Sequence, residues 1–135
     1  LQGSYNIRNF LISNPNKPDQ ILRSVGTPSQ PRILANFSTS ATLGSVSATW
    51  TARYTHHVKR DLNATAESSE VNNLPASVYH DLYITADVTE RLKLGLGIND
   101  IFDRNSPNKF FAGGGGGGVY DTIGRRFFLT AKVKM

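Results

Sequence analysis

The segment SVSATWTARYTHH, residues 45–57, is the clearest guide to the fold, because apolar and polar side chains alternate along it. Successive side chains of a β-strand point to opposite faces of the sheet, so a period of two is typical of a strand. One set is apolar and the other mostly carries hydroxyl groups: Val46, Ala48, Trp50, Ala52 and Tyr54 against Ser47, Thr49, Thr51, Arg53 and Thr55. The segment therefore predicts a β-strand with one apolar and one polar face.

The same period of two recurs along most of the chain. It is strong in residues 33–43, 78–88, 91–102 and 126–135, and weaker in residues 3–12. No segment has the sustained 3.6-residue apolar repeat of an amphipathic helix. We therefore predict an all-β fold of about six antiparallel strands, most of them longer than the usual ~5–6 residues.

The connections between these strands alternate in length. Three are long and polar, at Asn14–Gln30, Val58–Ala76 and Arg104–Gly124, and two are tight turns, at Leu43–Ser45 and Thr89–Arg91. This alternation predicts an up-and-down sheet with every long connection at one edge. Outer-membrane barrels have this form, with short periplasmic turns and long extracellular loops. A compact soluble domain rarely contains several loops longer than about 15 residues.

Composition narrows the possible classes. The chain has 135 residues, of which 39% are hydrophobic, and it contains no cysteine. Disulfide scaffolds, thiolate metal sites and cysteine nucleophiles are therefore excluded. No run approaches the ~18 apolar residues of a transmembrane helix, whereas a membrane strand needs only ~9–11 residues of alternating character. The chain begins at Leu1 with a strand-like segment and no signal sequence, so we expect it to be part of a longer protein.

The formal charge of +5 is informative only once the charged residues are placed. In the predicted strands the charged side chains share the polar face: Arg53, Asp81, Asp87, Lys93, Lys132 and Lys134. A lysine or arginine at the midplane of a lipid-facing surface costs about 2–4 kcal/mol, so this distribution fits a lumen-directed face. Tyr54 and Phe127 lie on the apolar face near the long-loop edge, where membrane barrels carry an aromatic girdle.

Two motifs near the end of the chain carry a family resemblance. LGLGINDIFDR occupies residues 94–104, and YDTIGRRFF occupies residues 120–128 before an alternating terminal strand. Together they resemble the C-terminal end of TonB-dependent outer-membrane receptors. The matching positions are Gly97, Asn99, Asp100, Ile101, Phe102, Asp103 and Arg104 in the first motif, and Tyr120, Asp121, Gly124 and Arg125 in the second. We expect these residues to be structural.

The resemblance implies that residues 1–135 supply about six of the roughly 22 strands of a transmembrane β-barrel. The N-terminal plug domain and the TonB box have no counterpart in the chain, and Met135 stands where such strands usually end in an aromatic residue. The intact receptor would contact lipid in the bacterial outer membrane and take up a nutrient such as a ferric siderophore, cobalamin or a carbohydrate. The TonB complex, engaged through the missing N-terminal part, would drive the uptake. The resemblance implies no enzymatic activity and no cofactor.

Two local features have simpler interpretations than a ligand site. The six consecutive glycines Gly113–Gly118 lack the Gly-Lys-Ser/Thr sequence and the following helix of a phosphate-binding loop. We interpret them as a flexible loop tip. His56 and His57 adjoin a long connection, and adjacent strand residues point to opposite faces, so we do not expect them to share a metal ion.

The remaining charged residues could suggest chemistry or a nucleic-acid partner. Three carboxylates, Asp100, Asp103 and Asp121, could serve acid–base catalysis or calcium binding. Because arginines lie close to them in sequence, we expect ion pairs and loop anchoring instead. The basic residues near the C-terminus could form a nucleic-acid surface with Phe128, but we favour a lumen and rim that attract anions, with no nucleic-acid partner.

Three alternatives to a receptor segment stay open. A small outer-membrane barrel with a structural or adhesion role would share the alternation but have no plug domain encoded upstream. A soluble all-β binding module would stay monomeric without detergent, whereas a receptor segment should aggregate in water through its strand edges and apolar face. A nucleic-acid-binding protein would lose affinity steeply as salt is raised.

Overall fold

The computed structural model describes residues 1–12, 15–17, 21–62, 72–104, 120–121 and 123–134. These residues form ten β-strands and no helix, so the all-β prediction is confirmed. The long strands are β4 (Ile33–Leu43), β5 (Val46–Thr55), β8 (Ser77–Asp87), β9 (Leu92–Asn99) and β10 (Arg126–Val133). The short strands are β1 (Gln2–Tyr5), β2 (Phe10–Ile12), β3 (Ile21–Arg23), β6 (Val58–Lys59) and β7 (Asn73–Leu74). In these ranges, no helix is long and apolar enough to cross a membrane.

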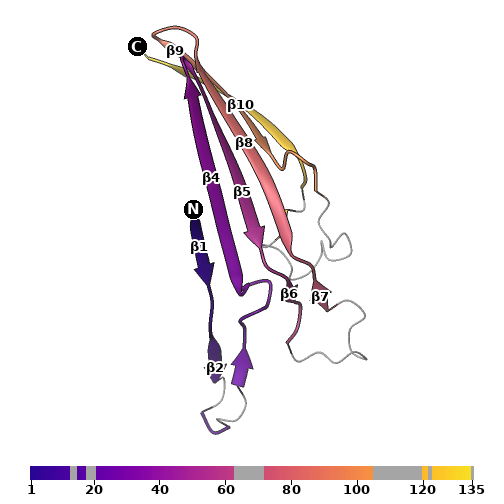
Figure 1. The fold of residues 1–135 in the computed structure, drawn as a ribbon. Coiled ribbons are helices and arrows are strands. Elements are labelled where there is room, and N and C mark those ends of the chain that lie inside the picture. Colours follow the sequence, from indigo (N-terminus) through magenta and orange to yellow (C-terminus); the bar gives the residue numbers. More distant parts are fainter. Residues whose placement is uncertain (13–14, 18–20, 63–71, 105–119, 122, 135) are drawn as a thin grey trace.

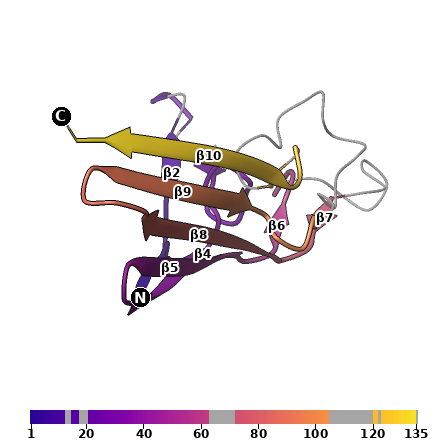
Figure 2. The ribbon, with the colours of Figure 1, turned by 90° about the horizontal axis from the view of Figure 1, so that it is seen from above.

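Six strands form one antiparallel sheet in the order β1-β4-β5-β8-β9-β10. The tight turns β4–β5 and β8–β9 lie at one end of this sheet, and the other connections leave it at the opposite end (Figure 1). Gly44 in the β4–β5 turn has a φ of 58°, a conformation that favours glycine. The sheet is a single layer from β10 across to β4 (Figure 2). The predicted up-and-down arrangement of antiparallel strands is therefore confirmed.

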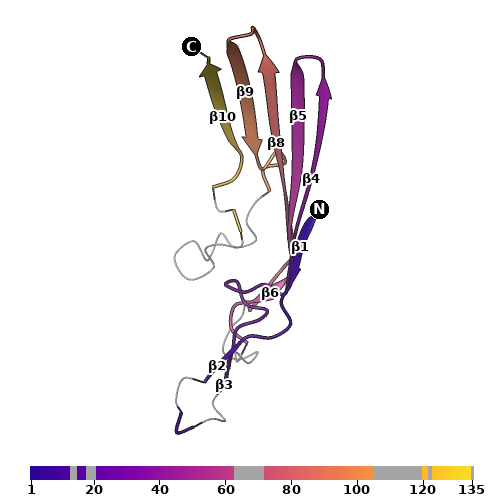
Figure 3. The same ribbon diagram turned by 90° about the vertical axis from the view of Figure 1, so that its left-hand side faces the viewer.

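The prediction of one continuous strand over residues 3–12 is wrong. This stretch contains β1, which pairs with β4, and β2, which pairs with β3 in a separate two-stranded sheet beyond the end of the main one (Figure 3). Pairing with β4 stops at Asn6, whose backbone N–H donates to Arg32 O at 2.8 Å and whose Nδ2 donates to Pro31 O at 2.7 Å. Proline has no backbone N–H, so the ladder cannot continue past Pro31.

The register gives the main sheet two chemically different faces, because residues paired across an antiparallel ladder share a face. The apolar face of β4 to β10 comprises Ile33, Ala35, Phe37, Thr39, Ala41, Leu43, Val46, Ala48, Trp50, Ala52, Tyr54, Val78, His80, Leu82, Ile84, Ala86, Leu92, Leu94, Leu96, Ile98, Phe127, Leu129, Ala131 and Val133. The polar face comprises Leu34, Asn36, Ser38, Ser40, Thr42, Ser47, Thr49, Thr51, Arg53, Thr55, Ser77, Tyr79, Asp81, Tyr83, Thr85, Asp87, Lys93, Gly95, Gly97, Asn99, Arg126, Phe128, Thr130 and Lys132. Every Asp, Lys and Arg of these strands lies on the polar face, as the alternation predicts.

The buried apolar side chains gather at the long-loop end of the sheet. They are Val58, Leu74 and Tyr120, which form one cluster and are 1%, 2% and 6% exposed, and Tyr79 of the polar face, which is 3% exposed. On the apolar face, by contrast, Phe127 and Leu129 are 65% and 82% exposed. The part of the chain that the structure describes therefore leaves the apolar face uncovered.

Candidate functional site

The two C-terminal motifs meet at the long-loop end of the sheet, where β9 ends and β10 begins. The backbone N–H of Arg125 donates to Asp103 Oδ1 at 2.9 Å, and Arg125 Nη1 donates to Ile101 O at 3.4 Å. Gly124 has a φ of 81°, and a β-carbon on it would lie 2.8 Å from Asp103 Oδ1. The close approach of the two motifs at this point therefore requires glycine.

Tyr120 and Asp121 fasten the second motif to β8. The buried Tyr120 hydroxyl donates to Pro75 O at 2.8 Å, and burial raises the pKa of Tyr120 to about 12. The backbone N–H of Asp121 donates to the Tyr79 hydroxyl at 3.1 Å. The Asp121 carboxylate accepts a hydrogen bond from Arg126 Nη2 at 2.6 Å and pairs with it electrostatically. These contacts hold Tyr120 and Asp121 against the segment before β8, against β8 itself and against the start of β10.

An arginine–aspartate pair extends this arrangement across the polar face. Arg53 Nε and Nη2 donate to the two carboxylate oxygens of Asp81 at 2.6 and 3.2 Å. The second oxygen also accepts the backbone N–H of Asp100 at 3.0 Å, which fixes the start of the turn after β9. The Arg53 guanidinium lies 5.5 Å from the centre of the Tyr79 ring. A bidentate pair of this kind has a directional geometry that a lysine could not supply.

We call this group the motif cluster; it comprises Arg53, Tyr79, Asp81, Asp100, Asp103, Tyr120, Asp121, Gly124, Arg125 and Arg126. Asp100 is its most buried member, with 1% exposure and a φ of 52°. Neither of its carboxylate oxygens has a hydrogen-bond partner among the residues that are described, and the same holds for Ser77 Oγ and Arg126 Nε. The other two motif carboxylates, those of Asp103 and Asp121, are engaged by backbone N–H groups and an arginine. The predicted ion pair with a nearby arginine is therefore found for Asp121, whereas Asp103 anchors a loop through a backbone N–H and Asp100 forms no ion pair among the described residues.

The remaining motif residues shape the two faces beside the cluster. A β-carbon at Gly97 would overlap the Phe128 ring, which lies 6.0 Å from the Tyr83 ring and nearly parallel to it. Glycine at 97 therefore makes room for an aromatic pair on the polar face. Phe102 packs edge-on against His80, with 5.0 Å between ring centres. Asn99 pairs with Arg126 at the last rung of the β9–β10 ladder.

One expectation about the histidines is wrong. The strand that was predicted over residues 45–57 ends at Thr55, so His56 and His57 lie beyond the alternation. Their ring centres are 4.0 Å apart instead of on opposite faces. Even so, no group of three or more His, Asp or Glu in the described ranges is placed to hold a metal ion. The glycines Gly113–Gly118 lie outside the described residues.

Sequence reasoning missed the contribution of β5 and β8 to the motif cluster. Arg53 and Asp81 are 28 positions apart, and Tyr79 and Asp121 are 42 apart, so no local pattern links them. A weak signal was present, because Arg53 and Asp81 are opposite charges on the polar sides of neighbouring predicted strands.

Comparison of the chain with known protein families, curated proteins and solved structures finds no match. A function for the chain must therefore be inferred from the chemistry of the two faces and from the motif cluster.

Proposed function

We propose that the chain forms part of the wall of a transmembrane β-barrel, as the C-terminal segment of a TonB-dependent receptor in the bacterial outer membrane. The observation that carries the proposal is that every charged side chain of the long strands lies on one face of the sheet, while the opposite face is almost entirely apolar.

The apolar face has no covering element among the residues that are described, and this is unusual for a protein in water. Exposed large side chains occur along its strands: Phe37, Leu43, Val46, Leu94, Leu96, Phe127, Leu129 and Val133. A contiguous apolar surface of this kind marks an interaction with a partner or a membrane. Lipid suits it, because the face carries no Asp, Glu, Lys or Arg over five strands.

Strand length and aromatic placement fit the dimensions of a bilayer. β4, β5 and β8 contain 11, 10 and 11 residues, against the ~9–11 residues that a tilted membrane strand needs. Trp50 and Phe127 lie on the same rung of the apolar face, and Tyr54 lies further toward the long-loop end. Tyr54 therefore has the position typical of an aromatic side chain at the membrane interface, whereas Trp50 and Phe127 lie deeper in the apolar band.

The polar face suits an aqueous lumen. Three hydroxyl pairs bridge β4 and β5 at 2.8–2.9 Å: Ser38 with Thr51, Ser40 with Thr49, and Thr42 with Ser47. The Arg53–Asp81 and Lys93–Asp87 pairs are partly exposed on the same face. Such groups tolerate contact with water and would be costly against lipid tails.

The motif resemblance supports a receptor in particular, beyond a membrane wall in general. The motif cluster ties the connection after β9 to the same end from which the other long connections leave (Figure 1). We propose that these connections border the outer vestibule, where a nutrient is bound. Uptake would require the plug domain and the TonB complex, which act through the N-terminal part of the intact protein. The remaining barrel strands would pair with the open edges of the sheet at β1 and β10.

Trp50 offers a direct test, because it is the one tryptophan in the chain and lies on the apolar face. We expect its fluorescence to be quenched strongly in vesicles of brominated lipid compared with unbrominated lipid. The matched control is Trp50→Phe combined with Thr51→Trp, which moves the probe to the polar face and should be quenched much less. Equal fluorescence of Trp50 in both lipids, or a chain that stays monomeric and folded without detergent, would reject a membrane wall.

The proposal that the chain belongs to a TonB-dependent receptor is tested separately, by sequencing and by deleting the gene that encodes it. The proposal expects the reading frame upstream of Leu1 to encode a plug domain, and deletion of that gene to abolish energy-dependent uptake of one nutrient. A short frame without a plug would instead support a small structural or adhesion barrel.

A further inference from the structure

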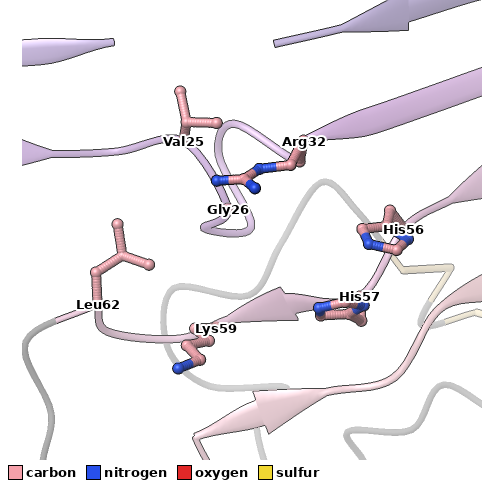
Figure 4. Close-up of a pocket in the computed structure, with 7 residues that line it drawn as sticks. All are labelled: Val25, Gly26, Arg32, His56, His57, Lys59 and Leu62. Carbon is pink, nitrogen blue, oxygen red and sulfur yellow. The ribbon is translucent and has the colours of Figure 1, made fainter. Parts of the chain in front are cut away.

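A basic pocket lies beyond the end of β5, outside the sheet and outside the motif cluster. Its volume is about 320 Å³, and its walls are Val25, Gly26, Arg32, His56, His57, Lys59 and Leu62 (Figure 4). This is within the range of roughly 300–1,000 Å³ that small-molecule pockets occupy. It is large enough for a small oxyanion with part of the molecule that carries it.

Backbone contacts between three segments build the pocket. The turn before β4 is closed by Gly26 N–H donating to Gln30 O at 2.8 Å, and it docks on β6 through Lys59 N–H donating to Gly26 O at 2.7 Å. His56 N–H donates to Ile33 O at 3.0 Å and so holds the end of β5 against the start of β4, which follows that turn. The pocket walls are therefore positioned by backbone hydrogen bonds.

The polar side chains that line the pocket all carry nitrogen atoms as their polar groups, and none carries oxygen. Arg32 and Lys59 carry positive charge, and His56 and His57 contribute ring nitrogens. The Tyr54 hydroxyl lies 2.9 Å from His56 Nδ1 and orients that ring. Within the described residues, no carboxylate lines the pocket and no ion pair joins Arg32 or Lys59 to an acid.

This donor set disfavours a metal ion. The guanidinium and ammonium groups beside the two imidazoles would repel a divalent cation, and no carboxylate of the described lining offsets their charge. The same groups match a phosphoryl oxyanion, because guanidinium groups bind phosphate through two parallel hydrogen bonds and lysine adds a point charge.

We infer that this pocket binds a phosphoryl group, with Arg32 and Lys59 as its charged contacts and His56 and His57 as further hydrogen-bonding groups. The inference does not depend on the receptor proposal. The phosphoryl group can belong to a free phosphate compound or to a lipid headgroup, because the pocket adjoins Tyr54 at the end of the apolar face.

The test uses the full chain in dodecyl maltoside micelles, which contain no phosphate, with calorimetric titration of inorganic pyrophosphate. We expect saturable binding that weakens about tenfold in Arg32→Gln and in Lys59→Gln, because each loses a charge-assisted contact. Arg91→Gln is the control, since Arg91 is exposed at the opposite end of the sheet and its loss removes the same charge. Near-identical backbone amide spectra establish that all three variants keep the fold.

Vesicles with and without phosphatidic acid distinguish the source of the group. Binding to phosphatidic acid vesicles that pyrophosphate displaces, and that Arg32→Gln weakens, identifies a lipid headgroup. Saturable binding of pyrophosphate in micelles, together with vesicle binding that responds to neither change, identifies a free phosphate compound. Equal weakening in Arg91→Gln and Arg32→Gln would overturn the site, because it would show only diffuse surface charge. Binding of zinc chloride through His56 and His57 without binding of pyrophosphate would overturn it as well.

Discussion

The Asp103 carboxylate occupies the space that a β-carbon on residue 124 would need, with only 2.8 Å between Oδ1 and that position at Gly124. The same oxygen accepts the backbone N–H of Arg125, so this contact joins the two C-terminal motifs. Gly124 also has a φ of 81°.

Gly124→Ala should therefore lower the free energy of unfolding for two reasons. The left-handed conformation costs about 1–2 kcal/mol for a residue with a β-carbon, and displacing Asp103 adds about 1 kcal/mol more. Gly44→Ala is the matched control, because Gly44 has a φ of 58° but no atom within 4 Å of the place that a β-carbon would take. Urea titration in micelles should give a larger loss for Gly124→Ala, and equal losses would contradict the role of Asp103.

Gly97 should be intolerant of alanine because of Phe128. A β-carbon there would overlap the ring, and overpacking of this kind costs about 1–3 kcal/mol. In a Phe128→Ala background the obstacle is gone, so the cost of Gly97→Ala should fall below about 1 kcal/mol. Unfolding measurements on the four proteins of this cycle give the coupling directly. An unchanged cost in the two backgrounds would mean that the ring moves aside freely.

The Arg53–Asp81 pair should contribute more to stability than the Lys93–Asp87 pair. The first is bidentate, and its Asp81 side chain is 21% exposed, whereas the Asp87 side chain is 54% exposed. Double-mutant cycles with alanine should give a coupling of about 1–2 kcal/mol for the first and at most about 0.5 kcal/mol for the second. A coupling for Arg53–Asp81 no larger than that of the exposed pair would show that the fork geometry adds nothing.

Tyr120 should make stability fall at high pH. Burial raises the pKa of Tyr120 to about 12 in the folded chain, above the value near 10 expected for an unfolded chain. Its contribution is therefore fully present below pH ~10 and is lost as pH rises from about 10 through 12, because the unfolded state releases the proton first.

Tyr120→Phe isolates this effect from the other titrating groups. It removes the hydrogen bond to Pro75 O, at a cost of about 1 kcal/mol near neutral pH, and it also removes the high-pH loss. The difference in unfolding free energy between the two proteins should shrink as pH rises above 10. A constant difference from pH 8 to pH 12 would contradict the assignment.

The long strands could be predicted because their chemistry is local. The alternation over residues 33–43 matches the bounds of β4, and that over residues 45–57 places every residue of β5 on its correct face. The end of β1 could not be predicted in the same way, because its pairing with β4 stops at Pro31, which lies 25 positions from Asn6 in the sequence.

The candidate site could likewise be predicted only in part from the sequence. The motif residues could be selected from the sequence, but their contacts to Tyr79 and Asp81 depend on strand pairing that no local pattern specifies. The basic pocket was missed because it depends on where β5 ends. Two residues of extra strand would place His56 and His57 on opposite faces, whereas the observed end at Thr55 brings their rings together.

A spin-label scan of β5 tests most directly whether this sheet is a membrane wall. The chain contains no cysteine, so single cysteines at residues 46–55 can each carry one label in lipid vesicles. A membrane wall predicts that accessibility to oxygen peaks at the positions of Val46, Ala48, Trp50, Ala52 and Tyr54, while accessibility to a water-soluble nickel chelate peaks at the positions between them. Two in-phase profiles, or nickel access equal on both faces, would contradict it.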